Sequence, residues 1–217
     1  MWLEIKQTAN MEILDEMQLA IPVIAEVFAR VEEPFPGKPE SYRVGRIMAD
    51  RLDVSRIVEL GASVWSVADS DSSGLESAWA SLLDEDGTIR AEMSDTDLES
   101  VVYMYRFFLH TDFVEWKMPV MDMFCHVFGR AAVVLAQHHT TLFSDTEFSA
   151  LGFNLLPPTR FAAPVGYPDI DRETQFWARE NRLSADYGFS DYPEEPPGAL
   201  PKHEAWIQEQ CPNDRLC

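Results

Sequence analysis

Apolar side chains recur at helical spacing through much of the first 155 residues, and this periodicity constrains the fold more than any other feature of the sequence. In residues 11–33 the apolar positions repeat every three or four residues, at Ile13, Leu14, Met17, Ile21, Ile24 and Phe28. Such spacing gathers apolar side chains on one face of a helix. Pro22 is expected to kink or divide this helix, because proline has no N–H for the bond to the preceding turn.

Residues that favour helix starts accompany several of these segments. Asp53 is placed to cap the helix expected after it. Thr96 with Glu99, and again Ser144 with Glu147, have the spacing of a capping box. Each pair would satisfy backbone N–H groups in the first turn of the helix that follows.

Strand patterns are sparse by comparison. Residues 2–6 and 87–93 alternate weakly between apolar and polar side chains, which leaves room for a minor β-hairpin. The sequence therefore predicts an all-α, mainly helical fold, built as a compact multi-helix domain.

The composition changes after Leu156. Nine of the 14 prolines lie in the last 61 residues, where they alternate with many aromatic side chains. A disordered tail is typically poor in aromatic residues. We therefore expect a helical core domain over residues 1–155 and a Pro- and aromatic-rich C-terminal arm over 156–217, packed on the core. Two short helices are expected in the arm, over residues 171–183 and 201–210, the second starting at Pro201; the alternative is an arm that docks on a partner.

Acidic residues dominate the charge of the chain. Its 37 acidic and 17 basic residues give a formal net charge of −20. Nucleic acids and acidic membranes bind proteins through basic patches, so the charge argues against both as direct partners. A basic protein partner is expected instead, although an acidic proteome would explain the same bias.

The acidic bias is strongest between Trp65 and Asp112, where the sequence has eleven acidic residues and only two arginines. We take the acids of this stretch as the candidate partner-binding surface: Asp69, Asp71, Glu76, Asp84, Glu85, Asp86, Glu92, Asp95, Asp97 and Glu99. Carboxylates in such number would steer the approach of a basic surface. The alternative is a solvated acidic face without a partner.

One part of this stretch resembles the first half of a calcium-binding loop. Asp69, Asp71, Ser73 and Gly74 have the right order, but the twelfth position, which must be a bidentate glutamate, is Ala80. A turn that caps the next helix is therefore the better interpretation.

Four of the five histidines lie between His110 and His139. If residues after Pro119 form one helix, Asp122 and His126 share a polar stripe, whereas His138 points to the opposite, apolar face. Asp122 and His126 are thus the alternative metal-binding pair, and a solvated polar stripe is the favoured interpretation. An enzyme site assembled from several elements would draw on His110, Glu115, Asp122, His126, His138 and His139.

Motifs for phosphate binding, nucleophilic catalysis, zinc and di-iron centres do not occur in the chain. No cofactor is expected, and an enzyme is disfavoured without being excluded. The N-terminus lacks the pattern of a signal peptide, and three cysteines are too few for a disulfide scaffold, so a cytoplasmic location is expected.

These observations favour an acidic protein-binding protein that masks a basic surface or active site of a partner. Immunity proteins, antitoxins and enzyme inhibitors are of this type, and a toxin, a nuclease or another enzyme would be the partner. The alternative is a helical enzyme or metal-binding protein with a site around Asp122 and His126. A scaffold protein that docks through its aromatic arm is a third hypothesis.

Overall fold

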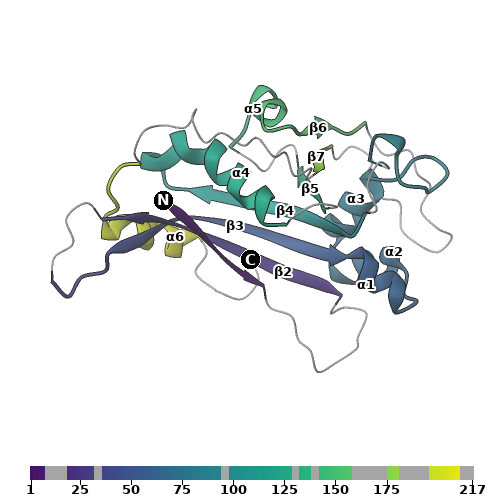
Figure 1. The fold of residues 1–217 in the computed structure, drawn as a ribbon, viewed down its shortest axis with the longest axis horizontal. Helices are drawn as coiled ribbons and strands as arrows, with labels where there is room; N and C mark the ends of the chain where they lie inside the picture. The colour runs from purple at the N-terminus through teal and green to yellow at the C-terminus, as the bar shows by residue number, and fades with distance from the viewer. Residues whose placement is uncertain are drawn as a thin grey trace.

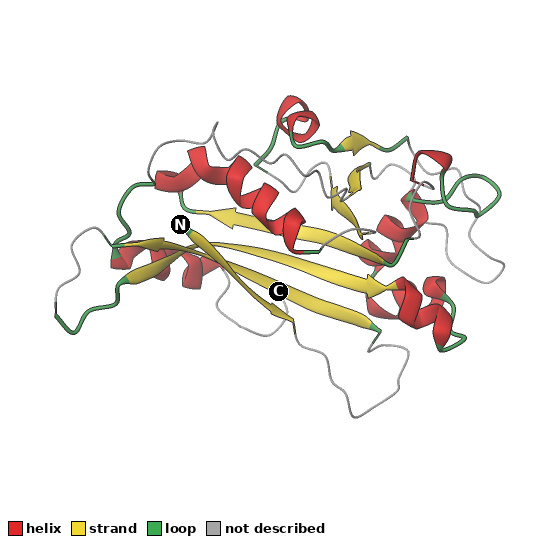
Figure 2. Cartoon of the chain, in the orientation of Figure 1, coloured by secondary structure: helices red, strands yellow, loops and turns green. Residues whose placement is uncertain are grey.

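The computed structural model describes residues 1–7, 19–31, 36–93, 98–128, 132–137, 142–157, 175–180 and 196–210. The fold is mixed α/β, so the expectation of an all-α protein was wrong. Its centre is a seven-stranded sheet in the order β1-β2-β3-β4-β5-β7-β6, with helices packed around it (Figures 1 and 2).

The strands are β1 (Trp2–Gln7), β2 (Ala20–Arg30), β3 (Ser41–Asp53), β4 (Ser100–Leu109), β5 (Ala132–Gln137), β6 (Asn154–Leu155) and β7 (Phe176–Glu180). The helices are α1 (Val54–Glu59), α2 (Val64–Asp71), α3 (Ser73–Ser81), α4 (Lys117–Val127), α5 (Asp145–Ala150) and α6 (Pro201–Gln210). Two 3₁₀ helices, η2 (Ala91–Met93) and η3 (Thr111–Trp116), complete the described elements.

Strands β1 to β4 form an antiparallel meander along the chain. β5 then pairs parallel to β4, because η3 and α4 carry the chain back across the sheet between them. β7 lies antiparallel between β5 and β6. β7 comes from the segment predicted as an arm, where we expected a helix over residues 171–183, so part of that segment is a strand of the central sheet.

Part of the first predicted helix is strand β2. Its sequence has apolar residues at helical spacing and also at the alternating spacing of a strand. Val23, Ala25, Val27 and Ala29 alternate onto one buried face of the sheet. Pro22 is accommodated in the strand opposite Asp50 rather than kinking a helix. The branched side chains of this segment suit a pleated surface, and pairing with β3 satisfies its backbone groups.

The segment after Thr96 was also misassigned. Glu99 precedes strand β4 rather than occupying the first turn of a helix, and Thr96 lies outside the described residues. β4 is buried on both faces near its start, from Ser100 to Met104. A strand covered on both sides shows a continuous apolar run instead of alternation, so its sequence could not be distinguished from a buried helix.

Two groups of buried side chains hold helices against the sheet. One places α4, through Phe124 and Cys125, against the face of β2, β3 and β4 that carries Val27 and Ile47. The other gathers α1, α2 and α3 around Leu52 at the end of β3. The three helices therefore lie together at one end of the sheet (Figure 1).

Helix α6 covers the other end of the sheet, where it packs on β3 (Figure 1). Glu26 points away from α4, because its neighbours Ala25 and Val27 face that helix. On this side Arg46 donates to Glu26 over 2.7 Å, and Arg43 bonds both Glu26 and Gln208 of α6. Burial alone would raise the pKa of Glu26, but the two arginines outweigh it and hold that pKa below its ordinary value.

Several predicted helix starts are confirmed. Asp53 accepts the Arg56 N–H over 3.0 Å and caps α1. Ser144 and Glu147 form the predicted capping box of α5. α6 begins at Pro201, as expected. Capping was thus predicted correctly at these three helix starts, but not at Glu99, which strand β4 follows.

No described helix is both long and apolar enough to cross a membrane. The longest of them, α4, has 11 residues, whereas a membrane span takes about 20. The compartment expected from the sequence stays a prediction.

Candidate functional site

The predicted acidic residues that the structure describes collect at the end of the sheet that α1, α2 and α3 occupy (Figure 1). Five of them are exposed there: Asp69 and Asp71 on α2, Glu85 and Asp86 in the turn after α3, and Glu99 before β4. The backbone N–H of Ser55 in α1 bonds the Glu99 carbonyl over 3.2 Å, which ties the start of β4 to this group of helices. We call this region, α1 to α3 with the turn at residues 84–88 and Glu99, the acidic end.

Two of the predicted residues serve the fold instead. Asp84 organises its own turn: its carboxylate accepts the Asp86 and Thr88 N–H groups over 3.0 and 3.1 Å and the Thr88 hydroxyl over 2.7 Å. The hydroxyl bond and the N–H bonds lower the pKa of Asp84. Glu76 is only 6% exposed. The side chain of Glu92 and all of Asp95 and Asp97 lie outside the described residues.

Four exposed carboxylates of the acidic end form no ion pair with the basic side chains that the structure describes. Within the described part of the chain, no ion pair joins Asp69, Asp71, Asp86 or Glu99 to a basic side chain. Their carboxylates are therefore accessible to a partner without first breaking an internal pair.

Like charges also meet inside this end. Burial, and then the charge of Asp71, raise the pKa of Asp50 on β3 to about 7. Burial, and then Asp69, raise the pKa of Glu76, whose Oε1 atom has no hydrogen-bond partner. Perturbed carboxyl groups of this kind mark candidate functional sites. The sequence had not singled out Asp50, because its neighbours come from other elements.

Tyr103 of β4 lines the same region. Burial, and then the nearby Asp50, raise its pKa to about 12. A Cβ atom on Gly74, in the first turn of α3, would lie 2.8 Å from the Tyr103 hydroxyl oxygen. Glycine at this position therefore allows α3 to approach the tyrosine closely. The calcium-like string does not form a loop, because Asp69 and Asp71 belong to α2 and Ser72 caps α3.

Asp122 and His126 lie one turn apart on α4, as predicted, with Asp122 Oδ1 4.0 Å from His126 Nδ1. The stripe is solvated only in part, because Asp122 is 5% exposed whereas the His126 side chain is 34% exposed. Arg179 of β7 donates to Asp122 Oδ1 over 2.7 Å. The Arg179 guanidinium thus supplies the positive charge that a metal ion would bring, and this geometry disfavours a metal site at Asp122 and His126. Metal binding by this pair stays an untested prediction.

The remaining histidines are dispersed. The predicted helix ends at Val127, followed by strand β5, and His138 and His139 lie outside the described residues. His110, at the end of β4, caps η3, and Glu115 is exposed on η3. The structure brings His110 together with His203 of α6, which we did not count among the candidate site residues.

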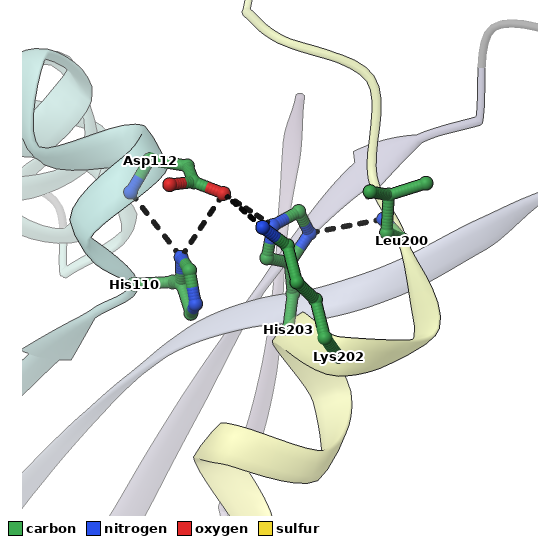
Figure 3. Close-up of polar contacts among 5 residues, drawn as sticks. All are labelled: His110, Asp112, Leu200, Lys202 and His203. Atoms are coloured by element: carbon green, nitrogen blue, oxygen red, sulfur yellow. Dashed lines mark hydrogen bonds and ion pairs between the residues drawn. The ribbon is translucent and has the colours of Figure 1, made fainter.

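His110, Asp112, Lys202 and His203 form a compact polar group, which we call the histidine clasp (Figure 3). Asp112 Oδ2 lies 2.9 Å from His203 Nε2, 3.0 Å from Lys202 Nζ and 3.6 Å from His110 Nδ1. The bonds from His203 and then Lys202 lower the pKa of Asp112 to about 2. The clasp joins α6 to η3 across 91 residues of sequence.

The clasp has the composition of a metal site, since two histidines and a carboxylate place three ligand atoms within 4.8 Å of one another. Its hydrogen bonds do not fit that role. His203 Nδ1 accepts the Leu200 N–H over 2.9 Å, so the ring proton is on Nε2, the atom that would bind the metal. His110 Nδ1 is likewise occupied by the Asp112 N–H over 3.2 Å. Metal-bound histidines instead donate their second ring N–H.

No protein-family model, curated protein or solved structure matches this chain. The function must therefore be argued from the geometry of the molecule alone.

Proposed function

We propose that the acidic end binds a basic protein and masks its basic surface, in the manner of an immunity protein, antitoxin or enzyme inhibitor. The observation that carries the proposal is the set of exposed carboxylates at this end, Asp69, Asp71, Asp86 and Glu99, that have no basic partner within the described residues.

The electrostatics of the free protein support this proposal. Asp50 is held partly protonated near neutral pH by burial and by the charge of Asp71. A basic partner would neutralise part of this charge, so binding would favour the ionised form of Asp50. The affinity would then contain a contribution from relieving repulsion as well as from new ion pairs.

The opposite end of the molecule offers a matched control. Besides Asp112 of the clasp, four carboxylates of the described residues are exposed there, around α6, η3 and the connection between β2 and β3: Glu40, Glu115, Glu204 and Glu209. Neutralising either set changes the net charge by four units. Any difference in binding between the two variants must therefore come from the position of the charges.

The test compares three proteins: the natural chain, an acidic-end variant (Asp69→Asn, Asp71→Asn, Asp86→Asn and Glu99→Gln) and a control variant (Glu40→Gln, Glu115→Gln, Glu204→Gln and Glu209→Gln). Each is immobilised and exposed to native lysate at about 50 mM salt, and bound proteins are released at about 500 mM salt and quantified. A captured basic protein whose gene lies near the gene of this chain is then purified for direct titration.

We expect the natural chain and the control variant to retain the same basic protein. The acidic-end variant should retain roughly tenfold less, since several ion pairs are removed together. Equal losses in the two variants would show that net charge alone causes the binding. Equal retention by all three proteins would show that the acidic end is not part of the interface.

A further inference from the structure

The two histidines of the clasp share one arrangement: the basic nitrogen of each ring faces a backbone N–H group (Figure 3). His110 Nδ1 accepts from Asp112, and His203 Nδ1 accepts from Leu200. A nitrogen that accepts an N–H carries no proton, so each neutral ring holds its proton on Nε2. The only position left for a second proton is therefore the blocked Nδ1.

Adding that proton would set one N–H donor against another. In His110 it would break the cap at the start of η3, and in His203 it would break the bond that closes the turn into α6. Because both bonds lie within the contact between the two helices, we propose that the histidine clasp is a pH-sensitive device that releases α6 from η3 and β3 when the solution becomes acidic.

The charged groups around the rings determine how the device responds. The rings of His110 and His203 are 4.4 Å apart between centroids, so a proton on one opposes a proton on the other. Lys202 adds positive charge, and Asp112 is the one carboxylate that favours protonation of His110 among the groups that influence it. From β3, Arg43 reaches α6 at Gln208 and is paired with Glu26. Burial, and then the charge of His203, lower the pKa of His110, which favours its neutral ring and its bond to the Asp112 N–H at neutral pH.

Within the described residues, α6 is held here by the clasp and by its packing on β3. His203 and Ile207 are its two buried side chains. Phe113 of η3 and Trp206 of α6 place their rings against His203 and His110, with centroids 5.0 and 5.4 Å apart. Just before the helix, the Ala199 N–H bonds the Arg30 carbonyl over 3.2 Å. His203 is therefore one of two side chains that anchor α6, and protonation of the clasp would loosen α6 before the sheet.

The test is amide hydrogen exchange of the whole chain between about pH 7.5 and about pH 5, corrected for intrinsic exchange. The comparison protein carries His110→Asn and His203→Asn. The asparagine oxygen can accept the same backbone N–H groups, but it cannot be protonated in this range. Peptides from α6 report the device, and peptides from β3 and β4 report global unfolding.

We expect protection of α6 in the natural chain to fall roughly tenfold on acidification, with β3 and β4 unchanged and no fall in the double asparagine variant. An equal fall in both proteins, or no fall in the natural chain, would overturn the proposal. If the double variant does not fold, imidazole nitrogen NMR of the natural chain decides. Unprotonated Nδ1 atoms at neutral pH that gain protons as α6 loses protection would support the device, and any other result would exclude it.

Discussion

At the acidic end, Asp69, Asp71, Asp86 and Glu99 form no ion pair with a basic side chain of the described residues, whereas at the α6 end the carboxylate of Asp112 is bonded by both His203 and Lys202. The pKa shifts follow this difference. Burial and Asp71 raise the pKa of Asp50 to about 7, and the two donors lower that of Asp112 to about 2. The negative charge of Asp50 is therefore destabilised at one end, and that of Asp112 is stabilised at the other. Charge that the fold leaves unneutralised is available to a partner.

The largest effect should come from His203→Ala at the clasp end. His203 is 1% exposed, and its ring contacts Phe113 and bonds Asp112 and the Leu200 N–H. Truncation would leave a cavity and remove the bonds to the Leu200 N–H and to Asp112, at a cost of roughly 3 kcal/mol in the free energy of unfolding. Chemical denaturation measures this cost. A loss below about 1 kcal/mol would mean that the clasp does not hold this end together.

A change of opposite sign is expected from Asp50→Asn at the acidic end. Because the pKa of Asp50 rises from its ordinary 3.8 to about 7 on folding, its contribution to stability is greatest below pH 3.8 and is lost as the pH rises to about 7. The variant should therefore be more stable than the natural chain by roughly 2 kcal/mol above neutral pH, and the gain should vanish in acid.

Denaturation midpoints as a function of pH check this prediction. Asp86→Asn, on the exposed turn of the same end, controls for the loss of one negative charge. If both variants gained the same stability at every pH, general charge repulsion would account for the effect. The raised pKa of Asp50 would then not be its cause.

The smallest effect is expected from Asp112→Asn, because Asp112 is exposed and solvent screens its interactions. Its lowered pKa stabilises the fold above the ordinary value of 3.8, and this contribution is lost as the pH falls towards 2. The variant should melt about 2 °C lower at neutral pH, with the difference closing in acid. If the difference in melting temperature grew in acid, the assigned direction of the pKa shift of Asp112 would be wrong.

Features set by neighbouring residues were the ones that the sequence predicted correctly. Asp53, the pair Ser144 and Glu147, and Pro201 all start helices, because capping involves only the first turn. Asp122 and His126 share a helix face for the same reason. Such chemistry can be predicted without knowing what the segment packs against.

Features set by the tertiary fold were missed. Residues 100–104 form a strand buried on both faces, and their apolar run carries no periodicity that would distinguish it from a helix. The clasp unites Asp112 with His203, 91 residues apart, and no spacing rule connects them. Asp50 was missed because its shifted pKa depends on burial and on Asp71, which is brought close only by the α1–α3 packing.

The most direct test of the contrast between the two ends is one NMR titration that follows the side-chain carboxyl carbons of all aspartates in the natural chain. The account predicts that Asp50 titrates with a pKa of about 7 and Asp112 with a pKa of about 2 in the same sample. Titration of both residues near the ordinary aspartate value of 3.8 would contradict it, because the two ends would then treat negative charge alike.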